Sequence, residues 1–300
     1  MSPNISSKKV ISTSLLVDIL DVLLNGIVAL ITGSSVMLAE ALQGVADLLT
    51  VIFLYIGVKR SARRPNKYYN FGYGRELYFW VMCAAVAMFS ITATLSVYSG
   101  IHKILNPAAL ENTFWAYLVL TIGVASNAYA LSLSVRKIRQ TPIKASVLKS
   151  FISSNLIEVK TASLTDMMGT TAAVFGIISL IVYAITGDPF FDGLGAVIIG
   201  ITIATFAIFL IIDVKDLIIG KSASPDKIEL IRKTAHENPS VERVSKIMSM
   251  HFGSEDIYVN LNLELDDKLK TPEIEKLNEK IERDIKQAVP EVDLVHIELG

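Results

Sequence analysis

Four stretches of this 300-residue chain run for 19 to 25 residues without a charged side chain, and they limit the possible folds more than any other feature. They are residues 77–101, 112–135, 167–185 and 193–212. About 20 apolar residues are enough for a helix to span the hydrocarbon core of a bilayer. Hydrophobic residues make up 52% of the chain, which is too many for an ordinary soluble domain. The sequence therefore predicts an integral membrane protein.

Further apolar segments raise the expected number of transmembrane helices to six. The expected spans are residues 11–32, 34–58, 76–102, 112–135, 158–185 and 190–212. An even number of spans places both ends of the chain on the same side of the membrane. The start of the chain lacks the features of a cleavable signal. Because no transit segment is apparent either, the sequence favours a prokaryotic inner membrane.

The charges of the loops indicate which side holds the two termini. The connections after the second and fourth spans are rich in Lys59, Arg60, Arg63, Arg64, Lys67, Arg75, Arg136, Lys137, Arg139, Lys144, Lys149 and Lys160. The loops on the opposite side hold only Lys103 among lysines and arginines. Positively charged loops stay on the cytoplasmic side, so both termini are expected in the cytoplasm.

The last 80 residues have a different character. Residues 1–220 carry 16 basic and 12 acidic side chains, whereas residues 221–300 carry 12 basic and 17 acidic ones. Apolar patterns predict a helix, two strands, a second helix and a final strand in this tail. The sequence therefore predicts a transmembrane domain at 1–220 and an α+β cytoplasmic domain, in the order αββαβ, at 221–300.

Two acidic residues lie deep inside predicted spans. Asp47 is about 12 residues from either end of the second span, and Asp166 lies in the fifth. Carboxylates at such depth are costly and persist mainly where they face a water-filled path, pair with each other or hold an ion. Gln43 lies four residues before Asp47 and therefore faces the same way. Together these oxygens suit a divalent cation of hard or intermediate character.

Simpler explanations exist for the buried acids. Asp47 and Asp166 could form a polar contact that locks two helices together, although such contacts usually use Ser, Thr, Asn or Gln. Asp18 and Asp21 lie within three turns of the cytoplasmic end of the first span, and Glu40 lies toward the outer end of the second. Water can reach Glu40 at that end. For Asp18 and Asp21, a role in ion binding and a purely structural role remain equally open.

The tail holds a second group of possible metal ligands. His296 and Glu298 are two residues apart, which places them on the same face of the last strand. His251 is the other candidate ligand. Exposed histidines at a strand edge, with no metal, are the simpler interpretation.

Several motifs resemble the cation diffusion facilitator family. They are TGSSVMLAEA at 32–41 followed by Asp47, FGYGRE at 71–76 followed by LYFW, the segment 192–200, MHFG at 250–253, and the closing His296 to Glu298. The resemblance covers nearly the whole chain and is greatest for the branch with mitochondrial and endoplasmic-reticulum zinc transporters. It implies six membrane helices, a ferredoxin-like tail, homodimers in the lipid membrane, and export of a divalent metal in exchange for protons.

The chain departs from that family at the transport site. The resemblance places a ligand pair on the second helix, here Gln43 and Asp47, and another on the fifth, here Ala162 and Asp166. Zinc-exporting members usually have histidine where this chain has Ala162. An oxygen-rich site without imidazole favours manganese or iron over zinc, the family default. Thr165 or Asn127 could complete the site instead.

A second metal site of the family is also altered. Its histidines correspond to Tyr69 and Tyr73 in this chain, so we expect that site to be absent.

These features favour cation/proton antiport over other functions. Burial favours the protonated form of a carboxylic acid and a bound cation favours the ionised form, so metal and protons should compete. The missing histidine keeps open a non-transporting role as a regulatory or heterodimer partner.

An intramembrane aspartyl protease is disfavoured because neither Asp47 nor Asp166 lies in a Gly-x-Gly-Asp element. Without a phosphate-binding GxxxxGK[ST] loop, ATP-driven pumping is disfavoured as well. We expect no enzyme activity, no cofactor and no nucleic-acid partner.

Overall fold

The structure, a computed structural model, describes residues 7–139, 157–254 and 256–300. These residues form two compact units, described separately below. The first contains the described residues up to 57 and those between 80 and 214. The second contains residues 58–79 together with those from 215 onward. The segment 58–79, which includes the end of α2 and the start of α3, thus groups with the C-terminal tail, which a division at residue 220 does not anticipate.

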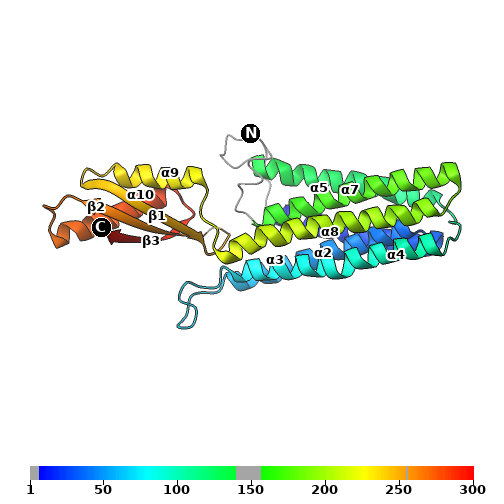
Figure 1. The fold of residues 1–300 in the computed structure, drawn as a ribbon, viewed down its shortest axis with the longest axis horizontal. Coiled ribbons are helices and arrows are strands. Elements are labelled where there is room, and N and C mark those ends of the chain that lie inside the picture. The colour runs from blue at the N-terminus through cyan, green and yellow to red at the C-terminus, as the bar shows by residue number, and fades with distance from the viewer. Residues whose placement is uncertain (1–6, 140–156, 255) are drawn as a thin grey trace. The chain divides into compact units, whose positions relative to one another are not determined.

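Six long helical segments follow one another in the described part of the membrane region (Figure 1). The third segment is composite, because a π-helical turn, η1, interrupts it. The elements are α1 (Ser7–Thr32), α2 (Ser35–Ser61), α3 (Glu76–Ala87), η1 (Met88–Ala93), α4 (Thr94–Leu105), α5 (Phe114–Arg139), α7 (Ile157–Thr186) and α8 (Phe190–Ile219).

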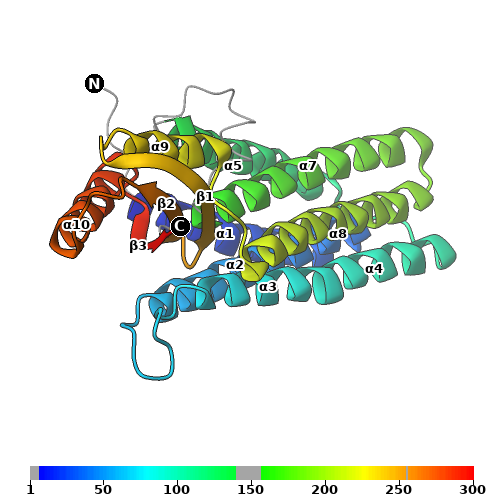
Figure 2. The ribbon, with the colours of Figure 1, turned by 60° about the vertical axis from the view of Figure 1, so that its left-hand side comes forward.

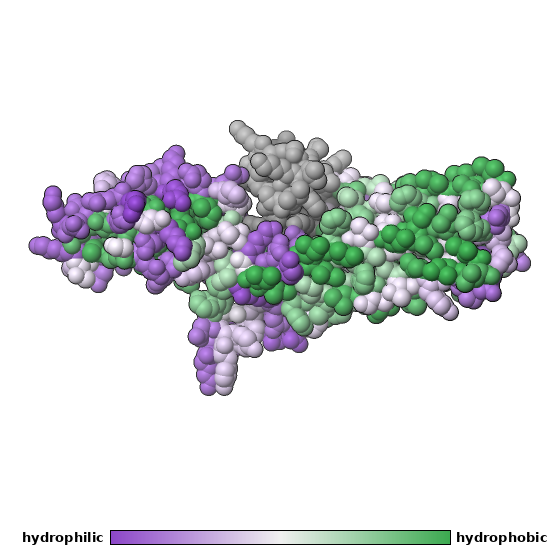
Figure 3. All heavy atoms as spheres, in the orientation of Figure 1, coloured by the Kyte–Doolittle hydropathy of each residue, from purple (hydrophilic) through white to green (hydrophobic). Residues whose placement is uncertain are grey.

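The helices have the length and surface of membrane spans. Among the described residues, four are long and apolar enough to cross a bilayer, namely Ser35–Ser61, Glu76–Leu105, Ser163–Thr186 and Phe190–Ile219. A shorter apolar helix covers Phe114–Tyr129. Large apolar side chains on these helices face outward, and Figure 3 shows extensive hydrophobic surface over this unit. The prediction of an integral membrane protein is confirmed.

Glycine allows two of the helices to pack backbone against backbone. A Cβ atom added at Gly100 of α4 would lie 2.5 Å from the carbonyl oxygen of Gly193 in α8. A Cβ atom at Gly193 would lie 2.7 Å from the carbonyl oxygen of Gly100. Small residues at such contacts let membrane helices approach closely. The α4–α8 contact therefore requires glycine at both positions.

Replacing Gly100 by alanine should weaken this packing. The new methyl group would overlap a backbone oxygen, which cannot rotate away, so α4 and α8 would have to separate. We expect Gly100→Ala to lower the unfolding temperature of the purified protein by several degrees. Gly26→Ala in α1 is the matched control, because nothing lies within 4 Å of a Cβ atom there. Since alanine favours helix over glycine, that variant should be at least as stable as the wild type. Equal melting of the two variants would contradict this packing.

The tail folds as the sequence predicts. Its elements are α9 (Pro225–His236), β1 (Val241–His251), β2 (Ile257–Leu265), α10 (Thr271–Ala288) and β3 (Val292–Leu299). The sheet order is β1-β2-β3, with β1 antiparallel and β3 parallel to β2. Figure 2 shows these strands beside the two helices. Alternation along β2 buries Val259, Leu261 and Leu263 against Ile231 of α9 and Ile281 of α10. The αββαβ fold class is confirmed.

Candidate metal site

The centre of the site is a pair of side chains one turn apart on α2. The amide Nε2 of Gln43 donates a hydrogen bond to Oδ2 of Asp47 at 2.9 Å. Both residues are buried, with 3% and 5% of their surface exposed. The remaining oxygens, Oε1 of Gln43 and Oδ1 of Asp47, have no hydrogen-bond partner among the described residues. Buried polar atoms in folded proteins nearly always have one, so these two oxygens are available to a cation or to water.

Asp166 approaches this pair from α7. It is 5% exposed, and its carboxylate is close enough to interact electrostatically with Asp47. One turn further along α7, a Cβ atom at Gly169 would lie only 2.8 Å from Nε2 of Gln43. The absence of a side chain at Gly169 thus allows α7 to lie against the polar face of α2. The structure brings Gln43, Asp47 and Asp166 into one region of the membrane unit.

Helix α1 adds two acids to the same region. Asp18 is 7% exposed and interacts electrostatically with both Asp47 and Asp166. Asp21 accepts a hydrogen bond at 3.2 Å from the side-chain amide of Asn127 in α5. Their spacing alone could not show that these acids face the interior, because the rotation of α1 depends on its packing against α5. Four helices therefore contribute polar side chains to one buried cluster.

The described carboxylates of this cluster are not arranged as a closed coordination shell. Among the described residues, no three His, Cys, Asp or Glu side chains are placed so that they could hold one metal ion together. Ala162 lies one turn before Asp166 in α7, and its side chain is outside the described set. The arrangement is an open group of oxygen donors.

A hydrogen-bonded contact at the N-terminal end of α2 fixes where this helix begins. The carboxylate of Asp192, at the start of α8, accepts hydrogen bonds from the hydroxyl of Ser34 and from the backbone amides of Ser35 at 2.7 Å and Val36 at 3.2 Å. A negative charge is favourable there because the first amides of a helix lack internal partners. Lys103 of α4 donates to the carbonyl of Gly33 at 2.9 Å. These contacts hold the start of α2, two to three turns from Gln43 and Asp47.

The tail residues His251, His296 and Glu298 do not come together. His296 and Glu298 lie on the open face of the sheet, where Glu298 accepts a hydrogen bond from the amide of Asn260 at 3.0 Å. His251 pairs with Ile257 on the helix-covered face and is 1% exposed. Alternation within a strand predicts which residues share its face, but not how that face relates to another strand. The three side chains therefore do not share a site within one tail.

His251 is a buried neutral imidazole. Burial lowers its pKa from 6.5 to about 4, and the positive charges of Lys227 and Lys221 act in the same direction, opposed by Glu291. In the part of the chain that the structure describes, both ring nitrogens lack hydrogen-bond partners. The unfolded chain therefore binds a proton at this residue more readily than the folded tail does.

The stability of the tail should depend on pH through His251. A histidine whose pKa is lower in the folded state makes folding less favourable as pH falls from about 6.5 toward 4. Hydrogen exchange of residues 241–251 in the full-length protein, corrected for intrinsic rates, should show protection decreasing over this window. The decrease should be smaller in His251→Leu and unchanged in His236→Leu, which alters an exposed histidine. A pH dependence unaffected by His251→Leu would contradict this assignment.

The loop 58–79 packs on the turn after β1 within the second unit. The ring of Phe71 stacks on Phe252 with centroids 5.0 Å apart, and the guanidinium of Arg75 lies 4.9 Å from the same ring. The hydroxyl of Tyr78 donates to the carbonyl of Gly253 at 2.6 Å. Gly74 must lack a side chain, because a Cβ atom there would be 2.4 Å from the carbonyl oxygen of Phe252. The loop and the tail are thus held together by aromatic and backbone contacts.

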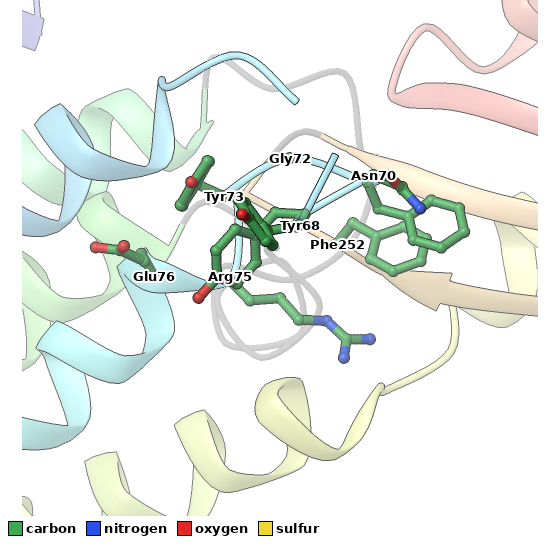
Figure 4. Close-up of a pocket in the computed structure, with 9 residues that line it drawn as sticks. Tyr68, Asn70, Gly72, Tyr73, Arg75, Glu76 and Phe252 are labelled. Atoms are coloured by element: carbon green, nitrogen blue, oxygen red, sulfur yellow. The ribbon is translucent and has the colours of Figure 1, made fainter. Parts of the chain in front are cut away.

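The same loop surrounds an open hollow of about 510 Å³ (Figure 4). Tyr69 and Tyr73 line it, with ring centroids 4.6 Å apart, and the hydroxyl of Tyr73 accepts a hydrogen bond from the amide of Asn66 at 2.7 Å. Phenol rings occupy the positions where the resemblance places histidine ligands. The hollow is therefore lined mainly by aromatic side chains and backbone.

Two protein-family models match the chain. The model of the cation efflux transmembrane domain matches residues 11–219, and the model of the cation efflux protein cytoplasmic domain matches residues 223–299. Together the two matches cover nearly all of the sequence.

Individual relatives are distant in sequence. The chain is 26% identical over 247 residues to the mitochondrial proton-coupled zinc antiporter SLC30A9 of Xenopus laevis, covering 80% of the chain and 43% of the relative. The human antiporter of the same name is 23% identical over 267 residues, with 88% and 47% covered. The chain thus spans less than half the length of these antiporters. The magnetosome protein MamB of Magnetospira is 23% identical over 273 residues, with 91% and 88% covered.

Proposed function

The chain belongs to the cation efflux family of membrane transporters, also called cation diffusion facilitators, and we propose that it exports a divalent metal ion from the cytoplasm in exchange for protons. The observation that carries this proposal is the pair of unpartnered oxygens on Gln43 and Asp47, with Asp166 beside them. Such a donor set, deep among membrane helices, is costly unless a cation or protons neutralise it. The work of this family is transport, so we assign no enzymatic reaction.

The donor set favours manganese or iron as the transported ion. Gln43, Asp47 and Asp166 offer oxygen atoms only, which suit harder divalent ions, whereas zinc binds more tightly where histidine or cysteine is present. The antiporters named above are zinc transporters, so zinc is the competing possibility. Ala162 supports the preference, because it removes the nitrogen ligand from the position four residues before Asp166.

Coupling to protons follows from the same carboxylates. With no cation present, burial among membrane helices favours the protonated, neutral state of an acid, and a divalent cation favours the ionised state. Entry of a metal should expel protons from Asp47 and Asp166, and protons arriving from the other side should expel the metal. Competition for one set of oxygens, together with access from one side of the membrane at a time, would couple the two fluxes, and the proton gradient would supply the energy.

The surroundings of the transporter are part of this proposal. The basic loops support a topology with both termini in the cytoplasm, where the acidic tail would lie. The match of the tail to a cytoplasmic dimer-type domain supports a homodimer. A prokaryotic inner membrane is the membrane that we propose. His296 and Glu298 could bind metal on the open face of the tail sheet, and His251 would not take part.

Reconstitution of this chain alone tests the function. Vesicles containing the purified protein, with an acidic interior, should take up Mn²⁺ or Fe²⁺ faster than Zn²⁺ and release protons as they do so. Empty vesicles and vesicles treated with a protonophore are the controls. Equal rates for zinc and manganese would remove the basis for the metal preference, and uptake independent of the pH gradient would contradict antiport.

A second candidate function is that of a non-transporting partner with the same fold. Two observations favour it: the missing ligand at Ala162 and the absence, among the described residues, of three convergent metal-binding side chains. In that case the chain alone should move no metal and should act only when reconstituted with a competent relative. Counterflow of Mn²⁺ in vesicles containing only this chain would exclude this candidate.

A further inference from the structure

Two more buried oxygens in the membrane unit lack hydrogen-bond partners within the described ranges, and the transport site does not use them. They are Oε1 of Glu40 in α2 and Oδ1 of Asn25 in α1. Glu40 is 5% exposed and Asn25 is 4% exposed. A polar contact that merely locked two helices together would leave these atoms hydrogen-bonded. These two oxygens are therefore available to a bound cation or to water.

Helical geometry places these two residues in one layer, displaced from the transport site. Glu40 precedes Asp47 by seven residues, which is two turns, or about 10 Å along α2. Asn25 follows Asp21 by four residues, so the two share a face of α1. Since α1 and α2 run antiparallel through a tight turn at Gly33, both displacements lead toward that turn.

Contacts between α1 and α2 confirm that the two faces meet at this level. A Cβ atom added at Gly44 would lie 2.8 Å from the side chain of Val22, so the helices touch between the two polar layers. The carboxylate of Asp21 interacts electrostatically with Glu40. Asn127 of α5 donates to only one oxygen of Asp21, its Oδ2. Asp21 and Glu40 therefore lie within electrostatic range of each other on two adjacent helices, and Asn25 lies one turn further along the same face of α1.

We propose that Asp21, Asn25 and Glu40 form a second binding station for the transported divalent cation, between the transport site and the outer end of α1 and α2. Two carboxylates and an amide oxygen provide the same oxygen-rich donor set as Gln43, Asp47 and Asp166, so both stations suit the same class of ion. The station rests on the proposed transport function. It would receive the cation that leaves Asp47 and hold it before release.

A metal-binding measurement on the full-length protein separates the two stations. We expect Glu40→Gln to bind about one Mn²⁺ per chain fewer than the wild type in equilibrium dialysis, because the site loses a charged oxygen ligand. Asn25→Leu, which removes an oxygen without changing the charge, should weaken binding of the same ion. Asp47→Asn should lose the other ion, and the double variant Asp47→Asn with Glu40→Gln should lose both.

A matched control excludes a general effect of charge. Glu111→Gln removes an exposed acid from the loop between α4 and α5, at the same end of the helices, and should bind Mn²⁺ as the wild type does. Full Mn²⁺ stoichiometry in both Glu40→Gln and Asn25→Leu would overturn the second station. If the wild type transports metal and Glu40→Gln transports and binds Mn²⁺ as well as the wild type does, the second station is wrong and the transport function stands. Should the wild type move no metal in vesicles, the transport function itself fails.

Discussion

Asp47→Asn should reduce metal uptake in reconstituted vesicles to the level of empty vesicles. Asparagine keeps the size of the side chain and one of its oxygens but loses the negative charge that a divalent cation requires. Removing even an outer partner of a metal ligand costs about 10- to 100-fold in affinity, so losing a charged ligand at the centre of the site should cost at least as much. Radioactive Mn²⁺ uptake by vesicles with an acidic interior measures this loss.

The same variant should also abolish metal-driven proton release. If Asp47 carries both the metal and the exchanged proton, a pH dye outside the vesicles will report no proton release when metal is added. Asp267→Asn, at an exposed position of the tail after β2, is a control that removes one carboxylate without touching the membrane unit. Proton release that persisted in Asp47→Asn would show that the exchanged protons reside elsewhere. Metal uptake that persisted would remove Asp47 from the transport site.

Ala162→His should shift the preference of the transporter toward zinc. A histidine at this position would lie one turn before Asp166 on α7 and would add a nitrogen ligand to an oxygen-only site. Because tetrahedral zinc sites commonly use imidazole, we expect the ratio of zinc to manganese transport to rise by about tenfold or more, equivalent to about 1.4 kcal/mol. Competition between the two metals in the same vesicles measures the ratio directly.

The control for this variant is a side chain of similar bulk without a ligand atom. Ala162→Leu should leave the ratio of zinc to manganese unchanged, even if it slows the transport of both ions. A ratio that rises equally in the leucine and histidine variants would mean that size, and not coordination, sets the preference. An unchanged ratio in Ala162→His would mean that this position does not face the metal.

Much of the fold follows from the sequence because it depends on composition along the chain. Uncharged runs mark the spans, and alternation marks β2 as a strand with one buried face, from Ile257 to Leu265. The π-helical turn at Met88–Ala93 has no such signal, since it depends on how the third segment packs. Contacts between residues far apart in the sequence, such as that between Arg75 and Phe252, likewise depend on the tertiary structure and not on a local sequence pattern.

In the candidate site too, some residues can be predicted from the sequence, and others depend on how the helices pack. Depth in an apolar run was enough to select Asp47 and Asp166, because a buried charge is costly wherever it faces. The participation of Asp18 and Asp21 could not be decided, since it requires the rotation of α1 about its axis. The sequence indicates Asp192 only as the first residue of the motif 192–200, without a role for its side chain. Its hydrogen bonds to the first amides of α2 join residues more than 150 positions apart, which no local pattern reveals.

The close approach of Gly100 and Gly193 limits how the proposed transporter can change shape. Where two helices touch through their backbones, no layer of side chains lies between them to rearrange as one slides along the other. Helices α4 and α8 should consequently behave as a single stiff pair during the transport cycle. In the antiport cycle proposed above, exposure of the buried acids first to one aqueous compartment and then to the other would then arise from movement of α1, α2, α5 and α7 against that pair.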